Sequence, residues 1–181
     1  MVSNQGRVIW SEESFQFIIS IHALGAIPKI DGQVSNANPA YAAGGPGGLT
    51  DGLKGSEDFS DGRWQGYAGQ DIEVTLDLGT KTEIGKISAD FFQRLISWIL
   101  IPEKAEFYVS GDGEKFRKVA EADNPVKPEN PGLIIQNFTS GNLKVKARYI
   151  RVFVKSQGLL PDWHTGAGNS SFIFLDEIVV E

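Results

Sequence analysis

Short runs of β-branched and aromatic residues recur along the chain, separated by glycine, proline, asparagine and aspartate. Several runs alternate apolar and polar positions, which is typical of strands with one buried face. In the run 72–78, for example, Ile72, Val74 and Leu76 would share one face. The pattern predicts strands near Arg7–Trp10, Ser14–His22, Ile72–Leu78, Glu83–Phe92, Ala105–Ser110, Phe116–Ala120, Leu133–Phe138, Arg148–Lys155 and Ser171–Val180.

Many short strands joined by turns, with no sustained helical period between them, indicate a β-sandwich or barrel. Double-sheet architectures also leave few unpaired strand edges. We therefore expect an all-β, jelly-roll β-sandwich of about eight antiparallel strands in two sheets. Residues 15–181 would form it and residues 1–14 would be a linker or the remnant of a preceding domain. The sequence leaves open whether residues 1–21 belong to the sandwich.

Two long segments, 32–62 and 156–170, lack strand character and are rich in glycine. Loops longer than about 12–15 residues in a compact domain are usually functional or disordered. Because Tyr41, Phe59 and Trp163 lie in these segments, we expect them to be functional.

The composition narrows the classes of function. The chain has 181 residues, which suits one domain, and its formal charge is −6, which argues against binding to nucleic acid. It contains no cysteine, so disulfides, thiolate metal sites and cysteine nucleophiles are excluded. The longest apolar run, 95–101 (LISWILI), is much shorter than the roughly 18 residues of a membrane span.

Catalysis finds little support in the sequence. A serine triad would need His22 or His164 as its base, and no G-x-S-x-G motif is present. The glycine-rich run 44–48 lacks the Lys-Ser/Thr of a phosphate-binding loop. The acidic residues are scattered over turns and strand ends. We therefore expect a domain without a catalytic centre.

The loop 48–56 (GLTDGLKGS) offers a carboxylate, hydroxyls and a flexible backbone within a few residues. Ca²⁺ prefers such oxygen ligands, many of them backbone carbonyls. The same pattern also fits an Asx turn, in which Asp51 bonds its own backbone. Residue spacing alone leaves both interpretations open.

Three tryptophans lie near cationic or imidazole side chains: Trp64 beside Arg63, Trp98 near Arg94, and Trp163 beside His164. An aromatic face with neighbouring hydrogen-bonding groups suits a sugar. Trp64 and Trp98 also fit a buried core. Trp163 follows Pro161-Asp162 in a glycine-rich loop, so we expect it to be exposed, with His164 as a partner for sugar hydroxyls.

Six segments, taken together and in order, resemble the coagulation-factor type C (discoidin-like) domain and its bacterial relatives, the family 32 carbohydrate-binding modules. They are 49–52 (LTDG), Trp64, 72–79 (IEVTLDLG), 109–116 (VSGDGEKF), 147–152 (ARYIRV) and 174–179 (FLDEIV). The resemblance covers about residues 49–181. It implies the jelly-roll sandwich and a non-catalytic glycan-binding role.

Further segments look like the C-terminal modules of bacterial chitobiase and β-N-acetylhexosaminidase: 22–25 (HALG), 55–59 (GSEDF), 63–66 (RWQG), 97–102 (SWILIP) and 163–168 (WHTGAG). This similarity implies a periplasmic, cell-surface or extracellular glycoside hydrolase as the parent protein. Its own catalytic domain and a glycan of hexosamine or galactose type would then be the partners, without membrane insertion.

The resemblance also implies a structural Ca²⁺ that fastens the long loop to the last strand. Carried over to this sequence, its ligands would be Gly48, Asp51, Leu53, Ser56, Asp176 and Glu177, with main-chain carbonyls at Gly48, Leu53 and Asp176. Sugar-binding residues would come from loops at one end of the sandwich. The candidates are Tyr41, Phe92, Gln93, Arg94, Trp98, Trp163 and His164.

Two other roles remain open at this stage. The domain could stabilise its parent enzyme without binding sugar, using the apolar run 95–101 as a docking surface. Membrane-surface recognition, as in some animal relatives, needs basic and apolar loop tips. The charge of −6 and the glycine- and alanine-rich loop 42–48 disfavour it.

Overall fold

The computed structural model describes residues 22–26, 29–30 and 37–181. The predicted strand Arg7–Trp10, most of Ser14–His22 and the proposed boundary after residue 14 lie outside these residues. His22, the last residue of that second strand, lies in a turn. Within the described parts of the chain, no helix is long and apolar enough to cross a membrane.

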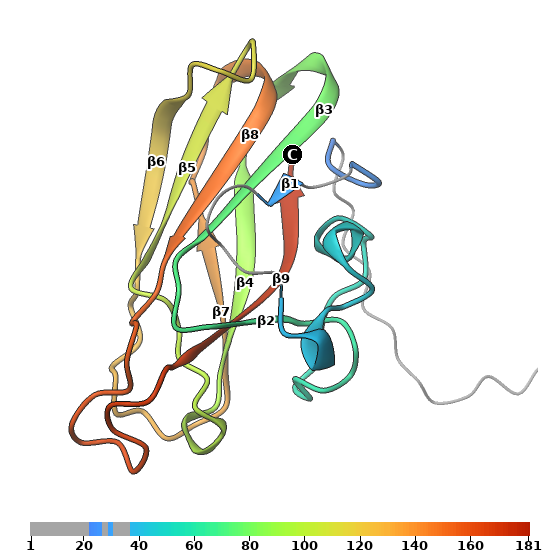
Figure 1. The fold of residues 1–181 in the computed structure, drawn as a ribbon. Coiled ribbons are helices and arrows are strands. Elements are labelled where there is room, and N and C mark those ends of the chain that lie inside the picture. Colours follow the sequence, from blue (N-terminus) through green and yellow to red (C-terminus); the bar gives the residue numbers. More distant parts are fainter. Residues whose placement is uncertain (1–21, 27–28, 31–36) are drawn as a thin grey trace, which may run out of the picture.

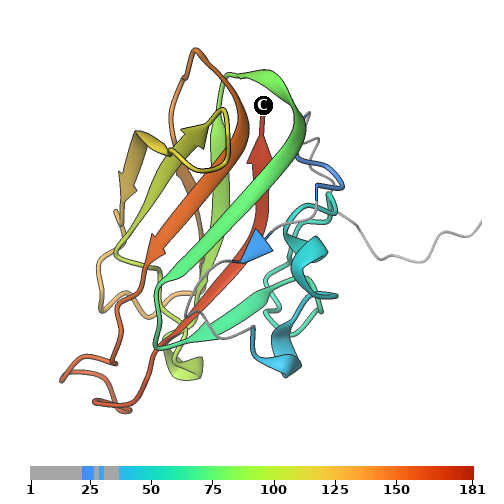
Figure 2. The same cartoon turned by 45° about the horizontal axis from the view of Figure 1, so that its top comes forward.

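Two antiparallel sheets pack face to face (Figures 1 and 2). One sheet contains, in spatial order, β1 (Lys29–Ile30), β3 (Ile72–Ile84), β8 (Val145–Lys155), β5 (Lys104–Ser110) and β6 (Arg117–Asp123). The other contains β2 (Gln65–Ala68), β9 (Phe172–Val180), β4 (Ile87–Gln93) and β7 (Ile134–Thr139). The prediction of an all-β jelly-roll sandwich is confirmed.

The core lies between the inner faces of the sheets. Every second residue of the paired strands β3 and β8 points inward, as the register Ile72↔Val154 and Val74↔Val152 shows. These four side chains are fully buried, together with Phe91 of the facing sheet. Each such side chain contributes roughly 1.5–3 kcal/mol through burial.

The strands differ from the prediction in several places, and the short β1 was not predicted. The run Glu83–Phe92 is not one strand, because the chain turns at Gly85 and both Gly85 and Lys86 donate backbone hydrogen bonds to the Glu181 carbonyl. β3 therefore ends before this turn and β4 begins after it. β2 was not predicted, since its sequence QGYA is short and contains a glycine in place of an apolar residue.

The segment 37–64 covers the outer face of the four-stranded sheet, beside β9 and β2 in Figure 1. It contains two 3₁₀ helices, η1 (Pro39–Tyr41) and η2 (Pro46–Leu49). Under this cover lies a second apolar cluster, in which Trp64, Phe92 and Phe174 are buried. Trp64 is therefore a core residue, the alternative that the sequence left open.

Three loops meet at one end of the sandwich, the lower end in Figure 1. They connect β4 to β5, β6 to β7 and β8 to β9, and they meet because the end of β4 pairs with the starts of β7 and β9. We call these three connections the loop end. Gln93 Nε2 donates to the Asn130 carbonyl at 2.9 Å, and Gln157 Nε2 donates to the Ile101 carbonyl at 3.2 Å. These bonds tie the loops to one another.

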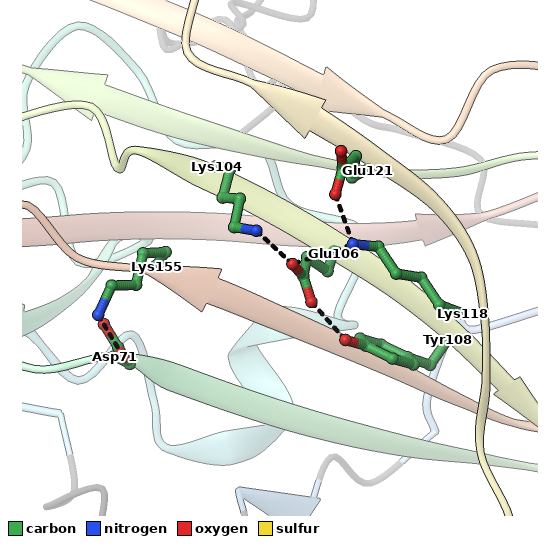
Figure 3. Close-up of polar contacts among 7 residues, drawn as sticks. All are labelled: Asp71, Lys104, Glu106, Tyr108, Lys118, Glu121 and Lys155. Atoms are coloured by element: carbon green, nitrogen blue, oxygen red, sulfur yellow. Dashed lines mark hydrogen bonds and ion pairs between the residues drawn. The ribbon is translucent and has the colours of Figure 1, made fainter.

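The start of the β8–β9 loop is also anchored to the five-stranded sheet. Asp71 accepts a hydrogen bond from Lys155 Nζ at 3.0 Å (Figure 3). It also accepts one from the Ser156 backbone N–H at 2.9 Å. The loop therefore leaves the sheet from a fixed point.

The outer face of the five-stranded sheet carries a network centred on Glu106 (Figure 3). Its carboxylate accepts hydrogen bonds from Lys104 at 2.5 Å and from the Tyr108 hydroxyl, and it lies 3.0 Å from Lys118 Nζ. Lys118 also pairs with Glu121. The Lys104 and Tyr108 hydrogen bonds lower the pKa of Glu106 to about 2, so this carboxylate is anionic at neutral pH.

Candidate functional site

His164 joins two of the three loops at the loop end. Its Nε2 lies 2.9 Å from the Leu95 carbonyl, while its Nδ1 accepts a hydrogen bond from the Gly166 N–H at 2.9 Å. This pattern assigns the hydrogen to Nε2, which donates to Leu95. His164 is buried and both ring nitrogens contact backbone groups. The expectation that it serves sugar hydroxyls is therefore corrected: it connects the β4–β5 loop to the β8–β9 loop.

Trp98 lies on the β4–β5 loop, where its backbone adopts a strained conformation. Its backbone is left-handed, with φ 64° and ψ 19°, which is costly for a residue other than glycine. A Cβ atom on Gly166 would come within 2.9 Å of the Trp98 ring, so the indole rests directly on this glycine. Backbone bonds from Trp98 to Leu95 and from Phe172 to Trp98, both 2.8 Å, fix the conformation. Such strain at a fixed surface residue is typical of functional sites.

Trp163 completes this group. Its side chain is 43% exposed and its ring meets that of His164 edge to face at 5.7 Å. Trp98 is 37% exposed. The loop end thus presents two partly exposed indoles on loops that His164 and Gly166 hold together.

The exposed large apolar side chains concentrate at this end. Five of the six that the described residues contain lie in the three loops: Ile96, Trp98, Leu133, Leu159 and Trp163. Ile96 is the most exposed, at 84%. Ile96 belongs to the run 95–101 that was considered as a docking surface, whereas Leu133 and Leu159 were not among the candidate site residues. In the sequence, such residues could be noticed only as apolar residues within turn-rich segments. This is weak evidence for a site, because single exposed apolar residues are common.

The other predicted sugar-binding residues lie in a different group. Phe92 is fully buried in the second cluster, and Gln93 is buried with its side chain engaged by the neighbouring loops. Both are corrected, since neither is accessible to a ligand. Tyr41 is half-buried against Phe174, with ring centroids 5.0 Å apart. Arg94 is exposed, with its guanidinium 5.7 Å from the centre of the Phe59 ring.

The structure thus divides the predicted residues into two neighbouring groups. Trp98, Trp163 and His164 form one, and Tyr41 and Arg94 border the second apolar cluster. The short segment after Arg94 connects them, because Leu95 bonds His164. Arg94 lies four residues before Trp98 on the β4–β5 loop.

The candidate metal centre lies under the long loop, at an irregularity of β9. Ala89 pairs with Ile178 and Phe91 pairs with Leu175, so two residues of β9 face the single residue Asp90. Bulges of this kind re-aim side chains. Here both carboxylates reach the loop: Asp176 accepts from the Gly55 N–H at 2.6 Å and Glu177 from the Gly52 N–H at 2.5 Å.

These two carboxylates are buried and incompletely bonded. Asp176 Oδ1 and Glu177 Oε2 have no hydrogen-bond partner, and both residues are at most 1% exposed. Burial raises the pKa of Asp176 to about 7. Burial also raises the pKa of Glu177 to about 8, and the neighbouring Asp51 side chain raises it further. A buried carboxylate oxygen without a partner is costly, and a bound proton or cation would remove this cost.

The other predicted metal ligands lie in the loop 48–56, and the side chains of two of them already accept backbone hydrogen bonds. Asp51 Oδ1 accepts from the Leu53 N–H at 2.8 Å, so the Asx turn is present. Ser56 Oγ accepts from the Asp58 N–H at 3.1 Å. Gly48 is tightly enclosed, since a Cβ there would come 1.9 Å from the Ala43 carbonyl oxygen. No three acidic, histidine or cysteine side chains in the described ranges form a metal cluster by themselves. A cation here would therefore need backbone carbonyls, which suits Ca²⁺.

Comparisons with known proteins address the fold and the family. Residues 33–173 match the model of the F5/8 type C domain. No curated protein matches the sequence. A fucose-binding module of Streptococcus pneumoniae, SpX-3, has a similar structure, with a TM-score of 0.53 and 15% identity over 90% of this chain and 98% of that one.

Two further solved structures are similar. The chitosan-binding module 1 of a chitosanase/glucanase from Paenibacillus sp. IK-5 gives a TM-score of 0.52 at 14% identity, covering 88% of this chain and 96% of that one. The C-terminal domain of a chitobiase from Bacteroides fragilis gives 0.51 at 15%, covering 87% and 94%. This chain spans only 27% of a longer similar structure, SpGH29. The structural likeness supports the fold, and the sequence match shows that the chain belongs to the F5/8 type C domain family.

Proposed function

We propose that this domain is a non-catalytic carbohydrate-binding module whose sugar-contacting surface is the loop end. The observation that carries the proposal is the pair of partly exposed indoles, Trp98 and Trp163, on loops joined through His164. A sugar ring can stack its C–H face on an indole. Because the loops are already fixed by hydrogen bonds, little conformational entropy is lost on binding.

Polar groups on the same two loops as the indoles would orient the sugar. Arg94 on one loop and Asp162 on the other are exposed, so the surface offers a donor and an acceptor. The similar modules from Streptococcus and Paenibacillus are named for binding fucose and chitosan. These names support a glycan ligand, and we propose one of hexosamine or galactose type.

The test is a glycan array followed by calorimetric titration with N-acetylglucosamine, N-acetylgalactosamine, galactose and chitobiose. Replacing Trp163 with Ala should weaken the best ligand at least about tenfold, a loss of roughly 1.4 kcal/mol. Leu24→Ala is the matched control, because Leu24 is 59% exposed but lies outside the loop end. Unchanged affinity in the Trp163 variant would refute this site.

We further propose a structural Ca²⁺ at the carboxylates of Asp51 and Glu177. The carbonyls of Gly48, Leu53 and Asp176 and the hydroxyl of Ser56 would complete its ligands. The buried, unpartnered oxygen of Glu177 supports this assignment. The ion would supply positive charge where carboxyl groups from the loop and from β9 meet, and so fasten the loop to the sheet.

The parent protein would be a secreted glycoside hydrolase of the chitobiase or hexosaminidase kind. A tethered module raises the local concentration of substrate around the catalytic domain without changing the chemistry. Deleting the module from the full-length enzyme should therefore reduce turnover of insoluble glycan and leave turnover of a small soluble substrate unchanged. Equal loss on both substrates would contradict a targeting role.

One observation favours a second role, docking onto the parent enzyme. Ile96 is 84% exposed and Leu159 is 60% exposed, and aliphatic side chains of this kind suit protein contact. An Ile96→Ser variant separates the roles. If docking is the function, this variant weakens association with the separately produced catalytic domain, and no sugar in the panel binds.

A further inference from the structure

The loop 48–56 is attached to the four-stranded sheet by an ion pair, in addition to its backbone bonds to Asp176 and Glu177. Lys54 Nζ lies 2.6 Å from Asp90 Oδ2. Asp90 is on β4, where it faces the bulge of β9 that presents the other two carboxylates. Carboxylates of two neighbouring strands therefore hold this loop at three positions.

The ion pair is anchored inside the fold. The side chain of Asp90 is 4% exposed and that of Lys54 is 27% exposed. Asn137 Nδ2 donates to the other Asp90 oxygen at 2.8 Å, so the carboxylate is fixed in the sheet. A buried carboxylate is costly without a compensating partner, and Lys54 supplies the cation. This pair is therefore stronger than an exposed surface ion pair.

Other contacts fix the loop backbone on both sides of Lys54. Arg63 Nη1 donates to the Lys54 carbonyl at 3.2 Å, and Trp64 Nε1 donates to the Ser56 carbonyl at 3.0 Å. A Cβ on Gly55 would come 2.3 Å from Trp64 Nε1, so the loop backbone packs directly on this buried ring. The chain makes these contacts by itself, so they hold the loop in place whether or not an ion is bound.

We propose that Lys54 is a positioning residue for the calcium site, and that its ion pair with Asp90 holds the loop 48–56 in the conformation that binds the ion. The proposal rests on the structural Ca²⁺ proposed above and adds the residue that prepares its site. Affinity falls with the fraction of molecules in which the loop is in place. A loop in place in only about a tenth of the molecules would bind calcium about tenfold more weakly.

The charge of Lys54 must be separated from its effect on the loop, because a lysine near a calcium site also repels the ion. Replacing Lys54 alone would leave Asp90 buried without its cation, which destabilises the fold and attracts the ion. Lys54→Met combined with Asp90→Asn removes the ion pair and leaves the net charge unchanged. A lower calcium affinity in this double variant would therefore report the position of the loop.

The test is calorimetric titration of the whole chain with calcium chloride, together with hydrogen exchange of the Gly52 and Gly55 amides in EGTA. The double variant should bind calcium at least about tenfold more weakly, and both amides should exchange at least about tenfold faster. Lys54→Arg keeps the cation and its hydrogen-bond donors, so this single variant should retain most of the wild-type affinity.

Lys86→Met combined with Glu181→Gln is the matched control, because it removes an ion pair of 2.9 Å whose side chains are more exposed. It should keep the wild-type affinity for calcium. Unchanged affinity in the folded Lys54 double variant would overturn the role of Lys54 and leave the calcium proposal standing. A wild-type chain that binds no calcium would overturn both.

The wild-type chain alone decides the question if the double variant does not fold. The ion pair predicts that the Gly52 and Gly55 amides stay protected from exchange in EGTA. Loss of their protection on chelation would show that the metal, and not Lys54, holds the loop in place, and would overturn the proposal.

Discussion

Replacing His164 with Ala tests how the loop end is built. The variant removes the bonds to Leu95 and Gly166, both 2.9 Å, and the edge-to-face contact with Trp163. Each hydrogen bond contributes about 0.5–1.5 kcal/mol and the ring contact about 0.5–1.5 kcal/mol. Their sum is roughly 2–4 kcal/mol of unfolding free energy, allowing for the buried groups left without partners.

Urea unfolding followed by tryptophan fluorescence measures this loss. Sugar affinity should fall as well, because Trp98 and Trp163 would lose their fixed relation. His22→Ala is the control, since His22 lies in a half-buried turn far from the loop end, and it should change stability by less than about 0.5 kcal/mol. If the His164 variant lost less than about 1 kcal/mol and kept its affinity, the role of His164 as the connection between the loops would be refuted.

Three further predictions concern other parts of the fold. Glu106 has a pKa lowered from 4.5 to about 2, so its stabilisation is complete above about pH 4.5 and is lost as the pH falls towards 2. Glu106→Gln should flatten that part of the stability–pH curve, and an unchanged slope would count against the network. Calcium should raise the melting temperature, EGTA should reverse this, and Glu177→Gln should abolish the rise; a full rise in the variant would exclude Glu177 as a ligand. Gly166→Ala should displace the Trp98 ring, 2.9 Å from the added Cβ, and weaken sugar binding, whereas unchanged affinity would show that the ring position is unimportant.

The alternation of residues located the strands but not the covering of their outer faces. A period of two places Phe92 on the face opposite Phe91, which would be the solvent side of a simple sandwich. Phe92 is buried because segment 37–64 folds over that face. No local pattern encodes this cover, since it depends on contacts between residues far apart in sequence.

The candidate metal centre shows the same limit. Gly52 and Glu177 are 125 positions apart and meet through a hydrogen bond. Spacing within the loop could indicate Asp51 as a ligand, but it could not supply the partner from β9. The family resemblance named Glu177, whereas the bulge that turns Asp176 towards the same loop is visible only in three dimensions.

His164 shows a third reason why the site could not be predicted fully from the sequence. Next to an exposed tryptophan, a histidine in a glycine-rich loop suggests a ligand contact. Its actual partners, the Leu95 carbonyl and the Gly166 N–H, are backbone groups that any sequence would offer. Side-chain identity alone therefore could not distinguish a residue that binds a ligand from one that holds the binding surface.

The most direct test of glycan recognition at the loop end is a crystal structure of the domain soaked with the best sugar from the array. We predict a pyranose ring stacked on the indole of Trp163 or Trp98, with its hydroxyls near Arg94. A sugar found only at other surfaces, with both indoles uncovered, would contradict the central claim.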